Sequence, residues 1–207
     1  MNIAYQALFY FIFVVPSAII HEYAHGWMAN ELGDPTAKHR GRLTLDPRAH
    51  IDMMGTILMP LFLLLVSGGN FLFAYAKPVP INHRNLNDQK WGPMWVALAG
   101  PLSNFALAAV FGLIIQIFPA SSAMVQPLLI IVFVNVLLGV FNMVPIPPLD
   151  GSKVLFAFLP ASYKEIEIKL RRYKFLILII FLLFGFELII PVIRYLTSLF
   201  TGGMVLF

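Results

Sequence analysis

Long apolar stretches separated by polar loops constrain this 207-residue chain more than any other feature. Crossing a bilayer core takes roughly 20 apolar residues per helix. Four stretches meet that length: residues 3–29, 94–118, 124–144 and 173–200. Composition agrees, because 59% of the residues are hydrophobic and only 12% are charged, against about 25% charged in soluble domains. The sequence therefore predicts an all-α polytopic membrane protein with about four transmembrane helices.

A fifth apolar stretch, residues 55–76, has a different character. Ser67, Gly68, Gly69 and Asn70 divide it into a helix-like first half and an alternating second half at 71–75. Non-helical backbone at membrane depth is tolerated only where protein or a water-filled cavity covers it. We therefore expect a re-entrant helix/strand segment with a cavity beside it. An ordinary kinked helix is the alternative.

The distribution of positive charge indicates an orientation. If residues 55–76 enter and leave on one side, every Lys and Arg except Arg194 faces the same compartment. Cytoplasmic loops carry an excess of Lys and Arg, so both long loops are predicted to be cytoplasmic and both termini outside, in a multi-pass protein of the cell membrane. The net charge of +4 is accounted for by this bias. Basic residues are not interleaved with aromatic ones as in a strand-binding groove, so we expect no nucleic-acid partner.

An H-E-x-x-H motif, residues 21–25, ends the first apolar run. On a helix, positions i and i+4 share a face, so His21 and His25 can bind one Zn²⁺ while Glu22 serves as general base toward a water. The chain has no cysteine, which restricts a zinc site to His and carboxylate ligands. The alternative is a pair of histidines that reach from the helix end to the membrane interface. An ionisable cluster inside a membrane favours the functional reading.

A second cluster lies at residues 141–151. Prolines at 145, 147 and 148 break the helix that begins at 124, because proline lacks the backbone donor. Asp150 follows, and a carboxylate at membrane depth costs about 2.5–3.5 kcal/mol unless it is paired. Asp150 and Gly151 could simply form a turn. Catalytic zinc usually takes three protein ligands, however, and the H-E-x-x-H motif supplies two, so we predict that Asp150 is the third.

Several other polar residues lie in or near the predicted spans. Asn104 could contact the substrate backbone or a developing oxyanion, or it could join two helices. Asn142 could orient a ligand or contact substrate. Asn135 and Gln116 are expected to form hydrogen bonds between helices, and Glu187 to do the same or to line a cavity or the outer interface.

The polar loops contain three further histidines, which we assign to solvated positions rather than to a metal site: His39, His50 and His83. In the loop at 150–175, Ser162 and Glu165 have the spacing of a capping box and predict the start of a short helix.

The two clusters together resemble the site-2 protease family, the intramembrane zinc metalloproteases of peptidase family M50. The shared elements are H-E-Y-A-H at 21–25, A-G-P-L-S-N at 99–104, which is similar to the family's G-x-x-x-N, and N-x-x-P-x-P-P-L-D-G at 142–151. The resemblance implies that His21, His25 and Asp150 bind zinc and that Glu22 is the catalytic acid/base. It also implies a re-entrant hairpin and a substrate helix that is cut within or near the bilayer.

We therefore expect one intramembrane metalloprotease domain over residues 1–207, without a PDZ or CBS module. Residues 1–151 form the catalytic core, and residues 152–207 form a cytoplasmic loop and the last transmembrane helix. The expected activity is a zinc metalloendopeptidase of regulated intramembrane proteolysis, with a transmembrane protein as substrate and the lipid bilayer as surroundings. A membrane metal transporter and a catalytically silent receptor of the same fold remain alternatives. A transporter would not need Glu22 beside the ligands.

Overall fold

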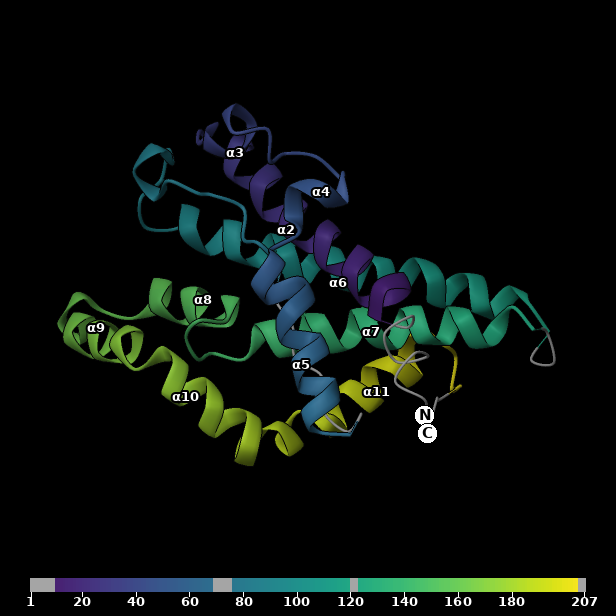
Figure 1. The fold of residues 1–207 in the computed structure, drawn as a ribbon. Helices are drawn as coiled ribbons and strands as arrows, with labels where there is room; N and C mark the ends of the chain where they lie inside the picture. The colour runs from purple at the N-terminus through teal and green to yellow at the C-terminus, as the bar shows by residue number, and fades with distance from the viewer. Residues whose placement is uncertain (1–9, 69–75, 120–122, 205–207) are drawn as a thin grey trace.

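The computed structural model describes residues 10–68, 76–119 and 123–204. Every regular element in these ranges is a helix, which confirms the predicted all-α class for the described part of the chain (Figure 1). The α-helices are α2 (Val15–Glu31), α3 (Thr36–His39), α4 (Pro47–His50), α5 (Met59–Val66), α6 (Gly92–Ile117), α7 (Val125–Met143), α8 (Asp150–Phe158), α9 (Lys164–Arg172), α10 (Lys174–Ile180) and α11 (Ile190–Phe200). The π and 3₁₀ turns are η1 (Tyr10–Val14), η2 (Met53–Leu58), η3 (His83–Asn85), η4 (Ala161–Tyr163), η5 (Phe181–Gly185) and η6 (Phe186–Leu188).

Helix α6 forms the centre of the molecule. It runs beside α7 along their length and also packs against α2 and α8 (Figure 1). Apolar side chains fill the contact between α6, α7 and α11, among them Ala108, Ile115, Val132 and Ile193. The helix that carries the H-E-x-x-H motif is therefore held against a rigid apolar pair.

Two of the predicted spans appear as uninterrupted helices. α6 and α7 are long and apolar enough to cross a membrane, and they match the predicted stretches 94–118 and 124–144 to within two residues. The first predicted span is helical from Tyr10 to Glu31, and its residues 3–9 lie outside the described ranges. These helices support a membrane protein, while the number of spans stays a prediction.

The last predicted span, 173–200, is not one straight helix. Its two halves, Lys174–Leu188 and Ile190–Phe200, are bent by 56° at a short break. Pro191 lies in the first turn of α11 and has no N–H for the carbonyl of Glu187, and Gly185 weakens the turn before it. The predicted last span is therefore a bent pair of helices, and its crossing of the membrane stays a prediction.

Residues 53–66 form a single apolar helical segment through η2 and α5. At 14 residues it is about 21 Å long, too short to cross a hydrocarbon core of about 30 Å. This length agrees with the helical half of the predicted re-entrant segment. The predicted alternating half at 71–75 lies outside the described residues.

The loop after α7 contains more helix than the sequence indicated. Residues 150–158 form α8, and the Trp91 and Phe158 rings meet edge to face at 5.3 Å between centroids, which holds α8 beside the start of α6. The predicted helix is present as α9, but it begins at Lys164 with Tyr163 at the capping position, and no side chain caps its first turn. The predicted capping box is therefore absent, because the 3₁₀ turn η4 takes up Ser162.

Buried Asp34 joins two polar loops that lie far apart in the sequence. Its Oδ1 accepts hydrogen bonds from the backbone N–H and hydroxyl of Thr36 and from Nδ2 of Asn85 at 2.9 Å, and its Oδ2 accepts from the Asn82 N–H at 2.6 Å. Burial alone would raise the pKa of Asp34. The hydrogen bonds from Thr36, Asn82 and Asn85 outweigh burial and hold this pKa below its ordinary value.

The extended chain at 77–82 crosses the end of α2 and is anchored along its length. The Lys77 N–H donates to the His50 carbonyl at 2.9 Å, and the Arg42 guanidinium donates to the Lys77 carbonyl at 2.8 Å. Asp34 holds the far end of the segment through Asn82. These anchors fix the 77–82 segment over the helix that carries the H-E-x-x-H motif.

We expect Asp34→Ala to lower the free energy of unfolding by about 2–4 kcal/mol at neutral pH, because each buried donor left unpaired costs about 1–3 kcal/mol. A carboxyl whose folded pKa lies below its unfolded value of about 3.9 stabilises the fold above that value and loses this effect as the pH falls through the folded pKa. The difference in melting temperature between wild type and Asp34→Ala should therefore shrink below about pH 4. Tryptophan fluorescence during heating in detergent measures it, with the exposed Glu165→Gln as control. A difference that is the same at acid and neutral pH would refute this account of Asp34.

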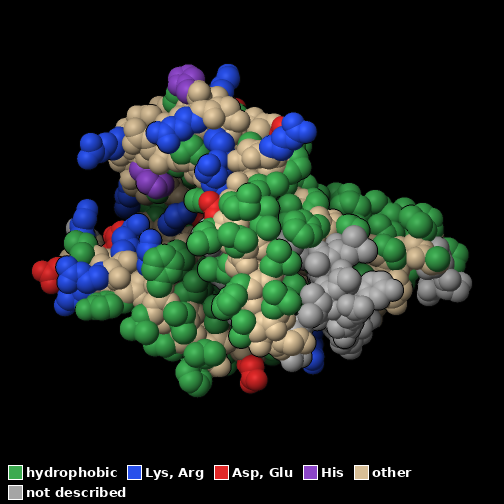
Figure 2. All heavy atoms as spheres, in the orientation of Figure 1, with side chains coloured by type: hydrophobic (Ala, Val, Ile, Leu, Met, Phe, Trp, Pro, Cys, Tyr) green, Lys and Arg blue, Asp and Glu red, His purple; other side chains and the backbone are tan. Residues whose placement is uncertain are grey.

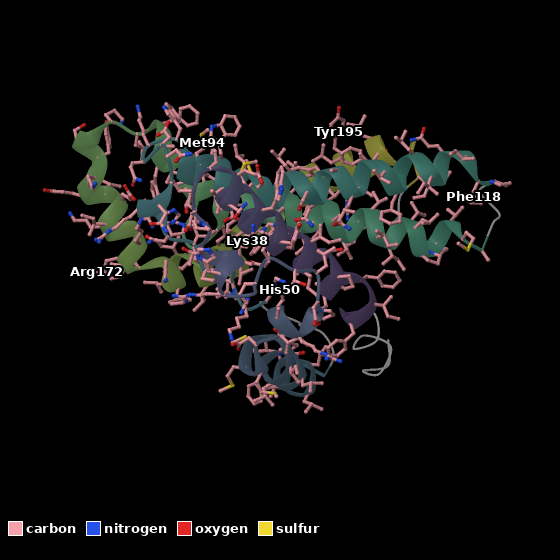
Figure 3. The ribbon with its side chains drawn as sticks, turned by 90° about the horizontal axis from the view of Figure 1, so that it is seen from above. Lys38, His50, Met94, Phe118, Arg172 and Tyr195 are labelled. Atoms are coloured by element: carbon pink, nitrogen blue, oxygen red, sulfur yellow. The ribbon has the colours of Figure 1, made fainter. Side chains whose placement is uncertain are left out.

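Charge is segregated on the folded surface. Figure 2 shows Lys and Arg side chains gathered at one end of the molecule, around α3, α4, α8 and α9, while hydrophobic side chains cover most of the rest of that face. In Figure 3, Met94 and Phe118 mark opposite ends of α6, and Arg172 lies toward the Met94 end. The basic end therefore coincides with the end of the bundle where the predicted cytoplasmic loops lie.

Candidate metal centre

His21 and His25 lie on the same face of α2, one turn apart, and both are 6% exposed. Their rings meet edge to face with centroids 4.6 Å apart. The face they occupy is turned toward α6 and the start of α8. Helical spacing thus places both imidazoles at the centre of the bundle, as the sequence predicts.

The hydrogen bonds of the two rings determine their tautomers. His21 Nδ1 lies 2.6 Å from Asn104 Oδ1, and His25 Nδ1 lies 2.6 Å from the Val96 carbonyl oxygen. Both partners can only accept, so each Nδ1 carries the proton. In the neutral rings each Nε2 therefore presents a lone pair, which is the form that binds a metal ion.

Asp150 reaches the two imidazoles through the proline-rich break after α7. It is the first residue of α8, and the Pro147–Pro148 bond before it is cis. A Cβ on Gly151 would lie 2.2 Å from the Met143 carbonyl oxygen, so only glycine lets α8 begin so close to the end of α7. Gly151 thus helps to bring the Asp150 carboxylate back toward the two imidazoles.

Three ligand atoms converge. Asp150 Oδ2 lies 3.2 Å from His21 Nε2 and 3.0 Å from His25 Nε2, and the two nitrogens are 3.0 Å apart. His21, His25 and Asp150 form the group of potential metal ligands in the described residues. A tetrahedral zinc site with bonds of about 2.0–2.1 Å spaces its ligand atoms about 3.3 Å apart. Three lone pairs at this spacing repel one another unless a cation or a proton lies between them, so the donor set and its spacing fit zinc.

Gly100 on α6 leaves the space in which these atoms meet. A Cβ there would lie 2.5 Å from His25 Nε2 and 2.6 Å from His21 Nε2. Real Cβ atoms essentially never approach other atoms so closely. The two imidazoles can therefore occupy these positions only if residue 100 is glycine.

We expect Gly100→Ala to abolish most metal binding while α6 stays folded, because alanine is favoured over glycine in a helix interior by about 1 kcal/mol and its methyl group would displace the imidazoles. The measurement is zinc per purified protein by elemental analysis. Gly139→Ala is the matched control, since its Cβ would press on the Phe105 ring instead and should leave zinc content unchanged. Full zinc content in Gly100→Ala would show that the ligand atoms do not meet there.

Lys153, one turn along α8, binds the other oxygen of Asp150. Its Nζ lies 2.9 Å from Asp150 Oδ1, and its side chain is 31% exposed. Asp150 therefore presents Oδ2 to the imidazoles and Oδ1 to Lys153. This salt bridge holds the carboxylate in the orientation that a ligand bound through one oxygen requires.

Glu22 is held by the 77–82 segment. Its Oε2 accepts a hydrogen bond from the Val79 N–H at 2.8 Å. Val79 stands between Pro78 and Pro80, which have no N–H, and a Cβ on Gly26 would lie 2.9 Å from Val79 Cγ1. Close contact between segment and helix thus fixes the carboxylate beside the two histidines.

The two asparagines predicted as substrate contacts form hydrogen bonds within the protein. Asn104 is fully buried: its oxygen accepts from His21, and its Nδ2 donates to Asn135 Oδ1 at 2.9 Å and faces the Ser17 carbonyl at 3.4 Å. Asn142 donates to the Leu138 carbonyl of its own helix at 3.0 Å. The structure brings Asn104 to the centre as a partner of a histidine, and contact of either residue with substrate stays a prediction.

The loop histidines divide into two kinds. His39 and His83 are exposed, as predicted. His50 is 1% exposed and donates from Nε2 to the Thr44 carbonyl at 2.7 Å, so its predicted solvated position is wrong. His50 belongs to α4, which packs against α2, and Figure 3 marks its position. None of the three belongs to the ligand group found in the described ranges.

Sequence reasoning missed Gly100, Lys153 and Val79 as individual contributors to the centre. Lys153 stands three residues after Asp150, a spacing that brings side chains together on a helix, and it could have been found if α8 had been predicted. Gly100 was noticed only as part of a motif. No local pattern links Val79 to Glu22.

An H-E-x-x-H helix, a converging third carboxylate and an apolar helical bundle together define the class of membrane zinc metallopeptidases. Comparison with known proteins agrees. The sequence model of peptidase family M50 matches residues 114–185, which include Asp150 but begin after the His21–His25 helix. "Putative zinc metalloprotease YwhC" of Bacillus subtilis is 33% identical over 178 residues, covering 82% of this chain and 77% of the relative.

Two more distant relatives are longer. "Zinc metalloprotease MJ0392" of Methanocaldococcus jannaschii is 29% identical over 202 residues, which cover 96% of this chain and 48% of the relative. Rip2 of Mycolicibacterium smegmatis is 25% identical over 173 residues, 81% of this chain and 63% of the relative. The chain thus spans about half to two thirds of the length of these two proteins. No solved structure matches the chain significantly.

The chain belongs to peptidase family M50, the site-2 protease family. It is a membrane metalloprotease whose cofactor is Zn²⁺. His21, His25 and Asp150 form its candidate metal site.

Proposed function

We propose that this protein is an intramembrane zinc metalloendopeptidase that hydrolyses peptide bonds of transmembrane proteins within or near the bilayer. The observation that carries the proposal is the convergence of His21, His25 and Asp150 within 3.2 Å at the centre of an apolar helical bundle, with Glu22 on the same helix. Hydrolysis there would occur at a depth where lipid-embedded chains are accessible.

The residues of the chain have separate roles in this proposal. His21, His25 and Asp150 hold the ion, and when bound it supplies Lewis-acid polarisation of the scissile carbonyl and lowers the pKa of a water. Glu22 takes a proton from the attacking water and returns it to the leaving amine. The Val79 N–H keeps the Glu22 carboxylate in place, and Lys153 orients Asp150.

The substrate must change shape before it is cut. A transmembrane helix hides its carbonyls in i to i+4 hydrogen bonds, so the scissile segment has to unwind or extend to expose one. We propose that substrates with weak helices near the depth of His21 and Asp150 are preferred. Gly and Pro in the substrate span would supply such weakness.

We also propose that the active site faces the cytoplasmic side and that both termini lie outside. The gathering of basic residues at the α3, α4, α8 and α9 end supports this orientation.

Reporters fused after Asn85 and after Ser162 are expected to signal a cytoplasmic location, and a reporter inserted at 120–123 is expected to signal the outside. The physical reason is the shared excess of Lys and Arg in both long loops. A fusion after Asn85 that lies on the opposite side from Ser162 would replace the re-entrant segment with a true span.

Comparison of membrane-protein fragments in two cell lines tests the activity. Cells that produce wild type and cells that produce Glu22→Gln are compared by mass spectrometry of new protein termini. We expect termini within or next to predicted spans in wild-type cells only. Identical sets of termini in both cell lines would remove the proposal.

A further inference from the structure

A chain of buried polar side chains runs from His21 away from the metal centre. Ser17, Asn104 and Asn135 belong to α2, α6 and α7, and they are 5%, 0% and 0% exposed. Asn135 Nδ2 donates to Ser17 Oγ at 3.0 Å and to the Ile131 carbonyl at 2.9 Å. These side chains join three helices whose contact is otherwise largely apolar.

In this row of side chains, groups at the far end from His21 determine which atom donates in each hydrogen bond. Ser17 Oγ donates its one proton to the Phe13 carbonyl at 2.9 Å, so toward Asn135 it can only accept. The Ile131 carbonyl also only accepts. Asn135 must therefore turn its NH₂ toward Ser17 and Ile131, which leaves its Oδ1 facing Asn104.

Asn104 is oriented in turn. Asn135 Oδ1 accepts from Asn104 Nδ2 at 2.9 Å, so Asn104 presents Oδ1 to His21 at 2.6 Å. A reversed Asn104 amide would place its Oδ1 against Asn135 Oδ1 and its NH₂ against the Nδ1–H of His21. Buried polar groups left unpaired in this way are costly. His21 therefore has one favoured tautomer, with the proton on Nδ1 and the lone pair on Nε2.

We propose that Asn135 and Ser17 are positioning residues for zinc binding, which act through Asn104 to hold His21 in its ligating tautomer. The inference rests on the proposed zinc site. Partners that fix the tautomer of a ligating histidine typically change metal affinity 10–100-fold when they are removed. His25 serves as a comparison within the same protein. Its Nδ1–H donates to the Val96 backbone carbonyl, so its tautomer does not depend on Asn135 or Ser17.

The test uses Asn135→Leu, which keeps the size of the side chain and removes its polar atoms, and Ser17→Ala as a milder second variant. Gln116→Leu is the matched control, since Gln116 also joins two helices, by donating to the Phe200 carbonyl at 3.0 Å, far along α6 from the centre. Zinc affinity of the purified proteins in detergent is measured by competition with a chelator. The His21 tautomer is read from the ¹⁵N shifts of its ring in metal-free protein.

We expect zinc affinity to fall about 10-fold or more in Asn135→Leu and less in Ser17→Ala, with Gln116→Leu within twofold of wild type. In metal-free Asn135→Leu the His21 ring should populate both tautomers, while His25 keeps its proton on Nδ1. Wild-type affinity and a single His21 tautomer in both variants would overturn the proposal, as would an equal loss in Gln116→Leu. The tautomer is measured without metal or substrate. It therefore tests the roles of Asn135 and Ser17 even if the protein cleaves no peptide.

Discussion

Asp150→Ala is expected to lose bound zinc and all cleavage activity. The substitution leaves two protein ligands, His21 and His25, where catalytic zinc sites usually have three. Removing a direct ligand should cost more than the roughly 10–100-fold that removal of an outer partner costs. The loss of affinity should therefore exceed that of removing an outer partner such as Asn135.

Zinc per purified protein, measured by elemental analysis, checks this result. Because Asp150→Ala also leaves Lys153 without its partner, Asp150→Asn is measured beside it as a variant of nearly the same shape. His39→Ala and His83→Ala are the controls, since both side chains are exposed. Near-stoichiometric zinc in folded Asp150→Ala, with loss in a control, would mean that the third ligand lies elsewhere.

Glu22→Gln is expected to bind zinc like the wild type and to lose cleavage by at least about 10²–10⁴-fold, the usual contribution of a general acid/base. The amide keeps an oxygen that can accept the Val79 N–H, so the 77–82 segment should stay in place. It cannot take a proton from water, which is the step that Glu22 performs. The variant thus separates chemistry from folding and from metal binding.

The measurement is cleavage of transmembrane proteins by the purified variant, with zinc content determined on the same sample. Arg42→Met serves as a control for the 77–82 segment, because it removes an anchor at Lys77 without touching Glu22. Cleavage by Glu22→Gln at the wild-type rate would refute its role as the base.

Periodicity and motif spacing predicted the parts of the protein that depend on nearby residues. The length and apolar character of α6 and α7 set their ends to within two residues. Helical spacing set the shared face of His21 and His25. Asp150 was predicted through chemistry alone, because a buried carboxylate needs a partner and the H-E-x-x-H motif lacked a ligand, and it lies 129 positions from His21.

Features that depend on tertiary packing could not be predicted in this way. The space left by Gly100 exists only because α2 crosses α6 at that residue. The contact between Val79 and Glu22 joins residues 57 positions apart, and the burial of His50 follows from the packing of α4 on α2. Pro191 could have indicated the bend, but the continuous apolar sequence around it was interpreted as a single span.

The central claim is that this chain cuts peptide bonds inside the membrane with the centre formed by His21, His25, Asp150 and Glu22. The most direct test places zinc-loaded wild type or Glu22→Gln in lipid vesicles with transmembrane proteins that accumulate uncut in Glu22→Gln cells. Mass spectrometry then maps the new termini against the predicted substrate spans. We expect new termini inside a span or within a few residues of one, and only with the wild type. Cuts confined to soluble loops, or equal cutting by Glu22→Gln, would contradict it.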